Sequence, residues 1–184
     1  MERQGFTLIE LIITLAVAVI LVTLAGPAIG HLIRDQQITS TQHALLASLR
    51  HARFEAIRRR APVIVCNGSP QEGCDSDNGW EQGWYTAAIP DGASGCRDKD
   101  QNGQCDSHAG EIVSEHEAIA DSLSLDGNGI LLTSRVRFQD DGFAQGYAGT
   151  FSICPGGDAE LSGSGIVLNI SGRMRNAEPS DLNC

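Results

Sequence analysis

The stretch GFTLIELIITLAVAVILV, residues 5–22, determines how the N-terminal part of this chain folds. From Phe6 to Ile33 the one charged side chain is Glu10, with histidine counted as neutral. About 20 consecutive apolar residues suffice for a helix to cross a bilayer. We therefore predict a short leader over residues 1–5 and a membrane-spanning helix over residues 6–33. A carboxylate is costly in such a segment unless a cation neutralises it, so Glu10 requires an explanation.

After Ile33 the chain becomes amphipathic. Apolar residues recur at helical spacing between positions 38 and 56, which favours a helix with one stripe facing a core. Pro62 disfavours helical backbone at the residue before it, so this helix is expected to end near Arg60. Residues 34–60 should thus continue the apolar segment as one long helix, and residues 34–184 should form a head outside the membrane.

The remaining residues, 61–184, have the pattern of β structure. Short runs rich in Val, Ile and aromatic residues are separated by clusters of Asp, Asn and Gly. We expect strands at residues 63–66, 84–89, 111–119, 130–132, 135–138, 151–154 and 166–170. Their close spacing favours antiparallel pairing, because no helical pattern lies between them. The predicted fold class is α+β, with the helix packed on an antiparallel sheet or small sandwich.

The six cysteines contain no C-x-x-C pair, which argues against a zinc or thioredoxin-like site. An even number of cysteines in an exported chain favours disulfides, with reduced buried thiols as the alternative. Short loops favour Cys66–Cys74 and Cys96–Cys105 among the fifteen pairings that six cysteines allow. Cys154 and Cys184 would then tie down the C-terminal end.

The formal net charge of -10 argues against a protein that coats nucleic acid or anionic lipid with its whole surface. It does not exclude a local basic patch. The sequence has no nucleophile elbow, phosphate loop, dinucleotide-binding fingerprint or zinc-protease motif. We therefore predict no catalytic residue and no cofactor.

The acidic loop DKDQNGQCD, residues 98–106, resembles part of a calcium-binding loop. Asp98, Asp100, Asn102 and Asp106 fall at offsets 1, 3, 5 and 9 of an EF-hand pattern. The twelfth position, which should carry a bidentate acid, is Ala109. A weak calcium site is thus one interpretation, and a turn closed by a disulfide is the favoured one.

The C-terminal segment SGRMRNAEPSDLNC, residues 171–184, brings two arginines together after a turn. Gly172 permits the turn, and Arg173 and Arg175 are expected on a loop. Guanidinium groups match the oxygens of a phosphate, so the loop is a candidate phosphate clamp. The alternative is a pair of solvated arginines, or of arginines salt-bridged to Glu178 and Asp181.

Residues 5–22 resemble the prepilin signature of type IV pilins and type II secretion pseudopilins. The resemblance implies that a prepilin peptidase cleaves after Gly5 and N-methylates Phe6. Glu10 then pairs with the N-terminal amine of a neighbouring subunit, which explains how a carboxylate is tolerated there. It also implies the type IV pilin fold, a single pass through the bacterial inner membrane with the head in the periplasm, and later assembly with other pilin subunits in a pilus.

Three further stretches are similar to the GspH/FimT branch of minor pilins and pseudopilins: LRHARFEAIRRRAPVIVC, GWEQGWYTAAIPD and DKDQNGQCDSHAGEIV. Within that branch, Gly172-Arg173-Met174-Arg175 resembles the DNA-binding tail of FimT-type pilins, which act in DNA uptake during natural transformation. This implies double-stranded DNA as a partner, bound by Gly172, Arg173 and Arg175. The alternative is a structural minor pilin or a GspH-like pseudopilin that primes or caps a filament without binding DNA.

Overall fold

The computed structural model of the chain describes residues 7–74, 79–129, 131–156 and 162–184, with the backbone alone described at 24–28. Gly5 and Phe6, the predicted processing site, lie outside these residues. The described residues belong to two compact units, one ending at Gln36 and the other spanning Gln37–Cys184. The helix α1 (Leu8–Arg59) contributes its first part to one unit and its second part to the other.

The first unit is the N-terminal part of α1. Its Leu, Ile and Val side chains are exposed, and Glu10 is exposed among them, with its N–H donating to Thr7 Oγ1 at 3.4 Å. Among the described residues, no helix combines the length and the hydropathy that a membrane crossing requires.

In the second unit α1 buries one stripe and then ends as the sequence predicts. Leu45, Leu49, Ala52 and Ala56 are completely buried, and they recur at three- and four-residue intervals along one face. The helix ends at Arg59, and Arg60 follows with a φ of 50° just ahead of Pro62.

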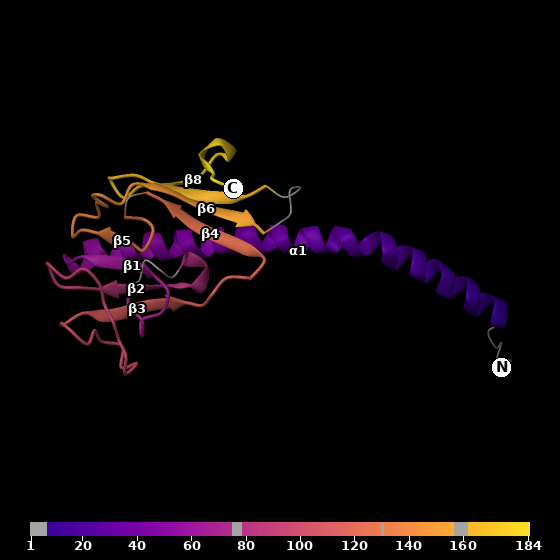
Figure 1. Cartoon of the computed structure of the whole chain (residues 1–184), viewed down its shortest axis with the longest axis horizontal. Coiled ribbons are helices and arrows are strands. Elements are labelled where there is room, and N and C mark those ends of the chain that lie inside the picture. The colour runs from indigo at the N-terminus through magenta and orange to yellow at the C-terminus, as the bar shows by residue number, and fades with distance from the viewer. Residues whose placement is uncertain (1–6, 75–78, 130, 157–161) are drawn as a thin grey trace. The chain divides into compact units, whose positions relative to one another are not determined.

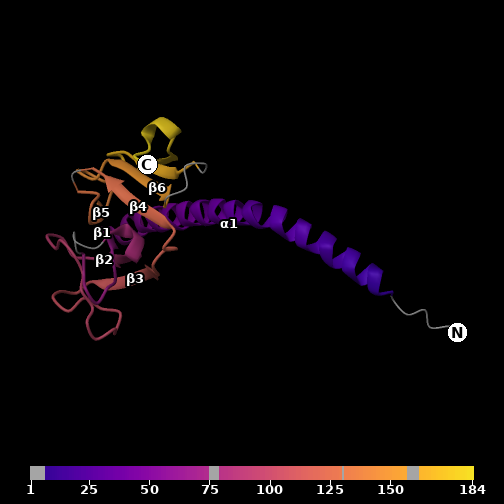
Figure 2. The same ribbon diagram turned by 45° about the vertical axis from the view of Figure 1, so that its right-hand side comes forward.

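Two four-stranded antiparallel sheets pack on this part of α1 (Figure 1, and turned in Figure 2). The first has the order β3-β2-β1-β5, and the second has the order β4-β6-β7-β8. The strands of the first sheet are β1 (Val63–Asn67), β2 (Trp84–Ala88), β3 (Glu111–His116) and β5 (Arg135–Phe138). Those of the second are β4 (Leu123–Asn128), β6 (Gly149–Pro155), β7 (Ser164–Leu168) and β8 (Met174–Asn176). Two short 3-10 turns, η1 (Trp80–Gln82) and η2 (Pro179–Asp181), complete the elements of the described residues.

The buried side chains of the second unit form two clusters. The inner cluster joins the α1 stripe to both sheets, and within it Trp80 meets the edge of Phe151 with ring centroids 5.0 Å apart. The outer cluster consists of Ile64, Cys66, Tyr85, Ala87, Ile89, Cys96 and Cys105. Successive residues of β1 and β2 alternate between the two clusters, so the clusters cover opposite faces of the first sheet.

The strand predicted at residues 130–132 was wrong at the two residues that the structure describes, and strands β4 and β8 were not predicted. Residues 131 and 132 lie in a turn, where the carbonyl of buried Leu132 accepts a hydrogen bond from Trp80 Nε1 at 2.7 Å. The strand lies earlier, as β4, which the sequence analysis missed because its second half reads Asp-Gly-Asn, a turn signal. These three residues instead pair with β6 opposite Ser152, Phe151 and Thr150.

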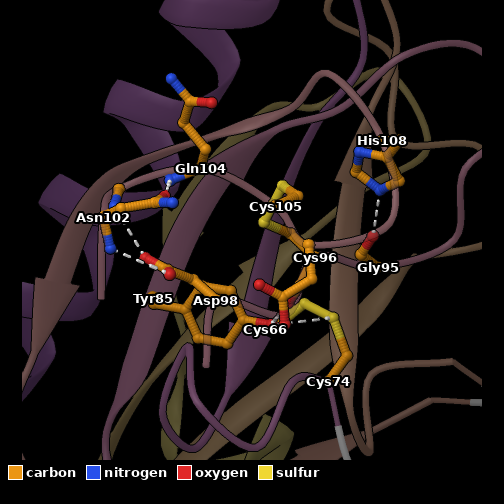
Figure 3. Close-up of a disulfide and its surroundings, with 12 residues drawn as sticks. Cys66, Cys74, Tyr85, Gly95, Cys96, Asp98, Asn102, Gln104, Cys105 and His108 are labelled. Carbon is orange, nitrogen blue, oxygen red and sulfur yellow. Dashed lines mark hydrogen bonds between the residues drawn. A yellow bond between two sulfur atoms is a disulfide. The ribbon is translucent and has the colours of Figure 1, made fainter. Parts of the chain in front are cut away.

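The structure has three disulfides: two join the pairs favoured by loop length, and the third joins the two cysteines that remained. Cys66–Cys74 and Cys96–Cys105 flank Tyr85 in the outer cluster (Figure 3). Cys154–Cys184 joins β6 to the end of the chain across 30 positions. The C-terminal segment beyond β8 is therefore held at its last residue.

Candidate nucleic-acid interface

The predicted turn before the two arginines connects β7 to β8, and Asn169 builds it. The Asn169 N–H donates to the carbonyl of Arg173 at 3.0 Å, and the Gly172 N–H donates to the carbonyl of Asn169 at 2.9 Å. Asn169 Oδ1 also accepts from the Arg173 N–H at 3.0 Å and from Ser171 Oγ at 2.7 Å. The backbone at Arg173 is therefore fixed from both sides.

Gly172 has a structural reason to be glycine. Its φ is 72°, in the left-handed region that side chains disfavour. A Cβ there would lie 2.1 Å from the carbonyl oxygen of Gly142, so the turn and the β5–β6 loop approach too closely for any side chain. Gly172 therefore positions Arg173.

Arg53 of α1 fastens this turn to the helix. Its Nε donates to the Gly142 carbonyl at 3.1 Å, and its Nη2 donates to the Ser171 carbonyl at 3.4 Å. One guanidinium thus joins α1, the β5–β6 loop and the β7–β8 turn.

An open groove of about 510 Å³ lies between α1 and the turn. Its lining residues are Arg50, Arg53, Phe54, Ile57, Gly172, Arg173 and Met174. Arg50, Phe54 and Ile57 share one helix face because they are four and seven positions apart. Arg50 and Arg173 are exposed on opposite walls, and among the described residues neither guanidinium has a hydrogen bond or ion pair.

Arg175 differs from Arg173 in its location and contacts. It lies in strand β8 rather than on the expected loop, and its Nη1 pairs with Asp181 Oδ2 at 2.8 Å. The same nitrogen donates to the carbonyl of Asn176 at 3.0 Å. The hydrogen bond between them raises the pKa of Arg175 and lowers that of Asp181. The salt-bridged alternative therefore describes Arg175, while Arg173 faces the groove.

Four other arginines of the second unit, Arg58, Arg59, Arg135 and Arg137, are engaged in structural contacts. Arg58 and Arg59 both bond to Glu55, and these hydrogen bonds, with Arg58 the larger cause, lower the pKa of Glu55 to about 2. Arg59 also pairs with Glu111 of β3.

Arg135 and Arg137 of β5 donate to the carbonyls of Ser94 and Ala93, in the latter case at 2.7 Å. They fix the β2–β3 loop over the first sheet. These side chains stabilise the fold and none of them lines the groove, where Arg50 and Arg173 are the exposed arginines.

The acidic loop is organised by its own backbone. The carboxylate of buried Asp98 accepts from the N–H groups of Asn102 at 3.1 Å and Gly103 at 2.8 Å (Figure 3). The Asn102 side chain bonds in turn to Asp100 and to the Gln104 N–H. The carboxylates of Asp98, Asp100 and Asp106 lie within 4.8 Å of one another. These contacts account for the loop as a turn closed by Cys96–Cys105, and calcium at Asp98, Asp100, Asn102 and Asp106 stays a prediction.

Two crystal structures of the type IV minor pilin FimU from Pseudomonas aeruginosa PAO1 share this fold. The TM-scores are 0.53 and 0.50, each at 17% identity. The first covers 80% of this chain and 92% of the other, and the second covers 77% and 94%. The predicted α+β pilin fold, a long helix on antiparallel sheets, is thereby confirmed.

The sequence comparisons then identify the family. Residues 41–172 match the model of the type II transport protein GspH, and residues 1–26 match the prokaryotic N-terminal methylation motif. No curated protein sequence matches the chain. The chain belongs to the GspH family and is a minor pilin-like or pseudopilin-like protein. Membership implies N-terminal processing and assembly with other pilin subunits, and proteins of this class are structural subunits rather than enzymes.

Sequence reasoning found one wall of the groove and missed the other. Gly172 and Arg173 were assigned to DNA binding from the resemblance of the C-terminal segment to the tail of FimT-type pilins. Arg50 and Phe54 were not assigned to the site, although their four-residue spacing places them on one helix face. The missing information was the tertiary contact that brings this face to the β7–β8 turn.

Proposed function

We propose that this protein is a minor pilin that binds DNA without sequence preference during DNA uptake. Arg173 is the main phosphate contact. The observation that supports this is the fixed β7–β8 turn, which presents an exposed guanidinium that is unpaired among the described residues. Because the backbone of the turn is already fixed, the turn loses little freedom when Arg173 binds a phosphate, and the planar fork of a guanidinium suits phosphate oxygens.

Arg175 is the second phosphate contact. Arg175 is exposed and Asp181 is half-exposed, and solvent weakens an ion pair of this kind, so a phosphate can replace the carboxylate. Because the whole chain carries a charge of -10, the affinity of one subunit should be modest. Several subunits in one filament would raise it through avidity.

Assembly places this head on a pilus. In the proposal, cleavage after Gly5 frees the amine of Phe6, the exposed Glu10 carboxylate meets the amine of a neighbouring subunit, and the apolar first unit holds the protein in the inner membrane before assembly. The matched N-terminal methylation motif over residues 1–26 supports this sequence of events.

The test is fluorescence anisotropy of labelled duplex DNA with the full chain in a nonionic detergent, over a series of salt concentrations. We expect Arg173→Ala to weaken binding about fivefold or more and to reduce the salt slope by roughly 1. Arg58→Ala removes an exposed arginine that pairs with Glu55, and it should change the affinity less than about twofold.

The second candidate function is a structural minor pilin or pseudopilin that primes or caps a filament without DNA. The match of residues 41–172 to the type II transport protein GspH favours it. Folded, oxidised protein that binds no DNA at low salt would reject DNA uptake and leave this alternative.

A further inference from the structure

The groove beside Arg173 offers more than positive charge. Phe54 is 59% exposed and Ile57 is 47% exposed, and both contribute apolar surface between Arg50 and Arg173. Met174 adds a further, partly buried side chain from the opposite wall. A volume of about 510 Å³ falls within the range of roughly 300–1,000 Å³ typical of small-ligand sites.

A site that binds only the backbone of duplex DNA does not require an exposed aromatic side chain such as Phe54. The bases of duplex DNA are stacked on each other, so their faces are unavailable, and the protein meets mainly phosphates. Unpaired nucleotides expose the faces of their bases, and proteins that bind single strands combine a positively charged groove with aromatic side chains. The groove between α1 and the β7–β8 turn has both elements.

We infer that this groove binds single-stranded DNA in preference to duplex. Phe54 stacks against an unpaired base, while Arg50 and Arg173 contact phosphates from the two walls. This inference rests on the proposed DNA-binding function and names the form of DNA that the site selects.

The contacts around the groove indicate which side chains are available to bind a phosphate and which are not. Arg53 points its guanidinium at the carbonyls of Gly142 and Ser171, so it shapes the groove rather than serving as a phosphate contact. Asp140 and Asp141 are exposed beside Gly142, and their charge opposes that of the groove. The affinity for single strands therefore depends on stacking as well as on charge.

The experiment compares labelled oligo(dT) with its duplex of the same length, using the full oxidised chain in nonionic detergent and anisotropy as the readout. We expect the single strand to bind about tenfold more tightly. Phe54→Leu should weaken single-strand binding by roughly 5- to 100-fold, which corresponds to the loss of one stacked base. The same variant should leave duplex binding within about twofold, and Phe54→Trp should retain the preference.

Two controls isolate the effect of the ring. Phe143→Leu changes a phenylalanine that is 41% exposed outside the groove lining, and both affinities should stay unchanged. Arg50→Ala should weaken binding of both forms of DNA. Thermal melting of each variant establishes that it is folded.

The outcomes separate this inference from the function on which it rests. If neither form of DNA binds, the proposed function itself fails. If duplex binds and Arg173→Ala weakens that binding, but Phe54→Leu leaves the ratio of the two affinities unchanged, DNA binding stands and the single-strand inference is wrong. In that case, a change of self-association in Phe54→Leu, measured by sedimentation, would assign the groove to contact between pilin subunits.

Discussion

The inner cluster draws its side chains from α1 and both sheets, whereas the outer cluster draws on β1, β2 and the loops that follow these strands. Both cover the same first sheet, on opposite faces. The inner cluster contains Trp80, Trp84 and Phe151, whose burial removes a large apolar area from water. The outer cluster has one aromatic residue, Tyr85, and two disulfides.

This difference shows how a small domain covers both faces of one sheet. On the face that the long helix α1 covers, burial of apolar residues that are far apart in sequence is sufficient to stabilise the packing. Where only loops are available, covalent closure limits the freedom of the unfolded chain and compensates for the small buried area. Tyr85 contacts a residue of each disulfide. Its hydroxyl donates to the carbonyl of Cys96 at 2.5 Å and lies 3.6 Å from Cys74 Sγ.

The largest effect is expected from Phe151→Ala in the inner cluster. Phe151 is completely buried against Trp80, so the substitution leaves a cavity between β6 and η1. We expect a loss of about 3–5 kcal/mol in the free energy of unfolding, measured by urea denaturation under oxidising conditions. Phe143→Ala, at an exposed phenylalanine, should cost less than about 1 kcal/mol. Equal losses would show that burial in the inner cluster is not what stabilises the domain.

A smaller effect is expected when the outer cluster loses a disulfide. The double substitution Cys96→Ser/Cys105→Ser opens a loop of 9 positions and should cost roughly 2–3 kcal/mol. Because Trp80 and Trp84 belong to the inner cluster, tryptophan emission of the folded variant should match that of the unmodified chain. If this variant shows the tryptophan emission of an unfolded protein before urea is added, the inner cluster depends on the Cys96–Cys105 disulfide and the two clusters are not independent.

The same contrast explains what the sequence could predict. The disulfides of the outer cluster join residues eight and nine positions apart, so short loop length was enough to select them. The buried stripe of α1 was evident from its periodicity. Strand β4 was missed because Asp126, Gly127 and Asn128 have turn chemistry, and only pairing with β6 makes them a strand.

For the candidate site, the limit of sequence reasoning was distance along the chain. The β7–β8 turn was predicted from Gly172 and its neighbours, which are local. Arg53 reaches Ser171 across 118 positions, and no periodicity or motif encodes that contact. For the same reason, sequence alone placed Arg173 and Arg175 together, whereas in the structure Asn169 holds the backbone of Arg173 and Asp181 holds the side chain of Arg175.

The smallest effect is expected at the polar contacts that link α1 to the edge of the first sheet. Arg59 bonds to Glu55 within the helix and to Glu111 of β3, and Glu111 pairs with Gln104 beside Cys105. These contacts connect the end of the helix to the loop that the Cys96–Cys105 disulfide closes. Glu55→Gln should cost about 1 kcal/mol or less at neutral pH, because Arg58 and Arg59 are partly solvated.

The pH dependence of the stability of Glu55→Gln tests whether Arg58 and Arg59 stabilise the charged form of Glu55. Hydrogen bonds from Arg58 and Arg59 hold the pKa of Glu55 at about 2, against an ordinary value of 4.5. Since the folded state binds this proton more weakly than the unfolded state, the stabilisation is complete above about pH 4.5 and is lost as the pH falls towards 2. Urea denaturation should therefore show a shallower decline for Glu55→Gln than for the unmodified chain in this interval. Glu115→Gln, at an exposed carboxyl of β3, controls for the loss of one charge. Parallel curves for Glu55→Gln and the unmodified chain would mean that the two arginines do not stabilise the charged form of Glu55.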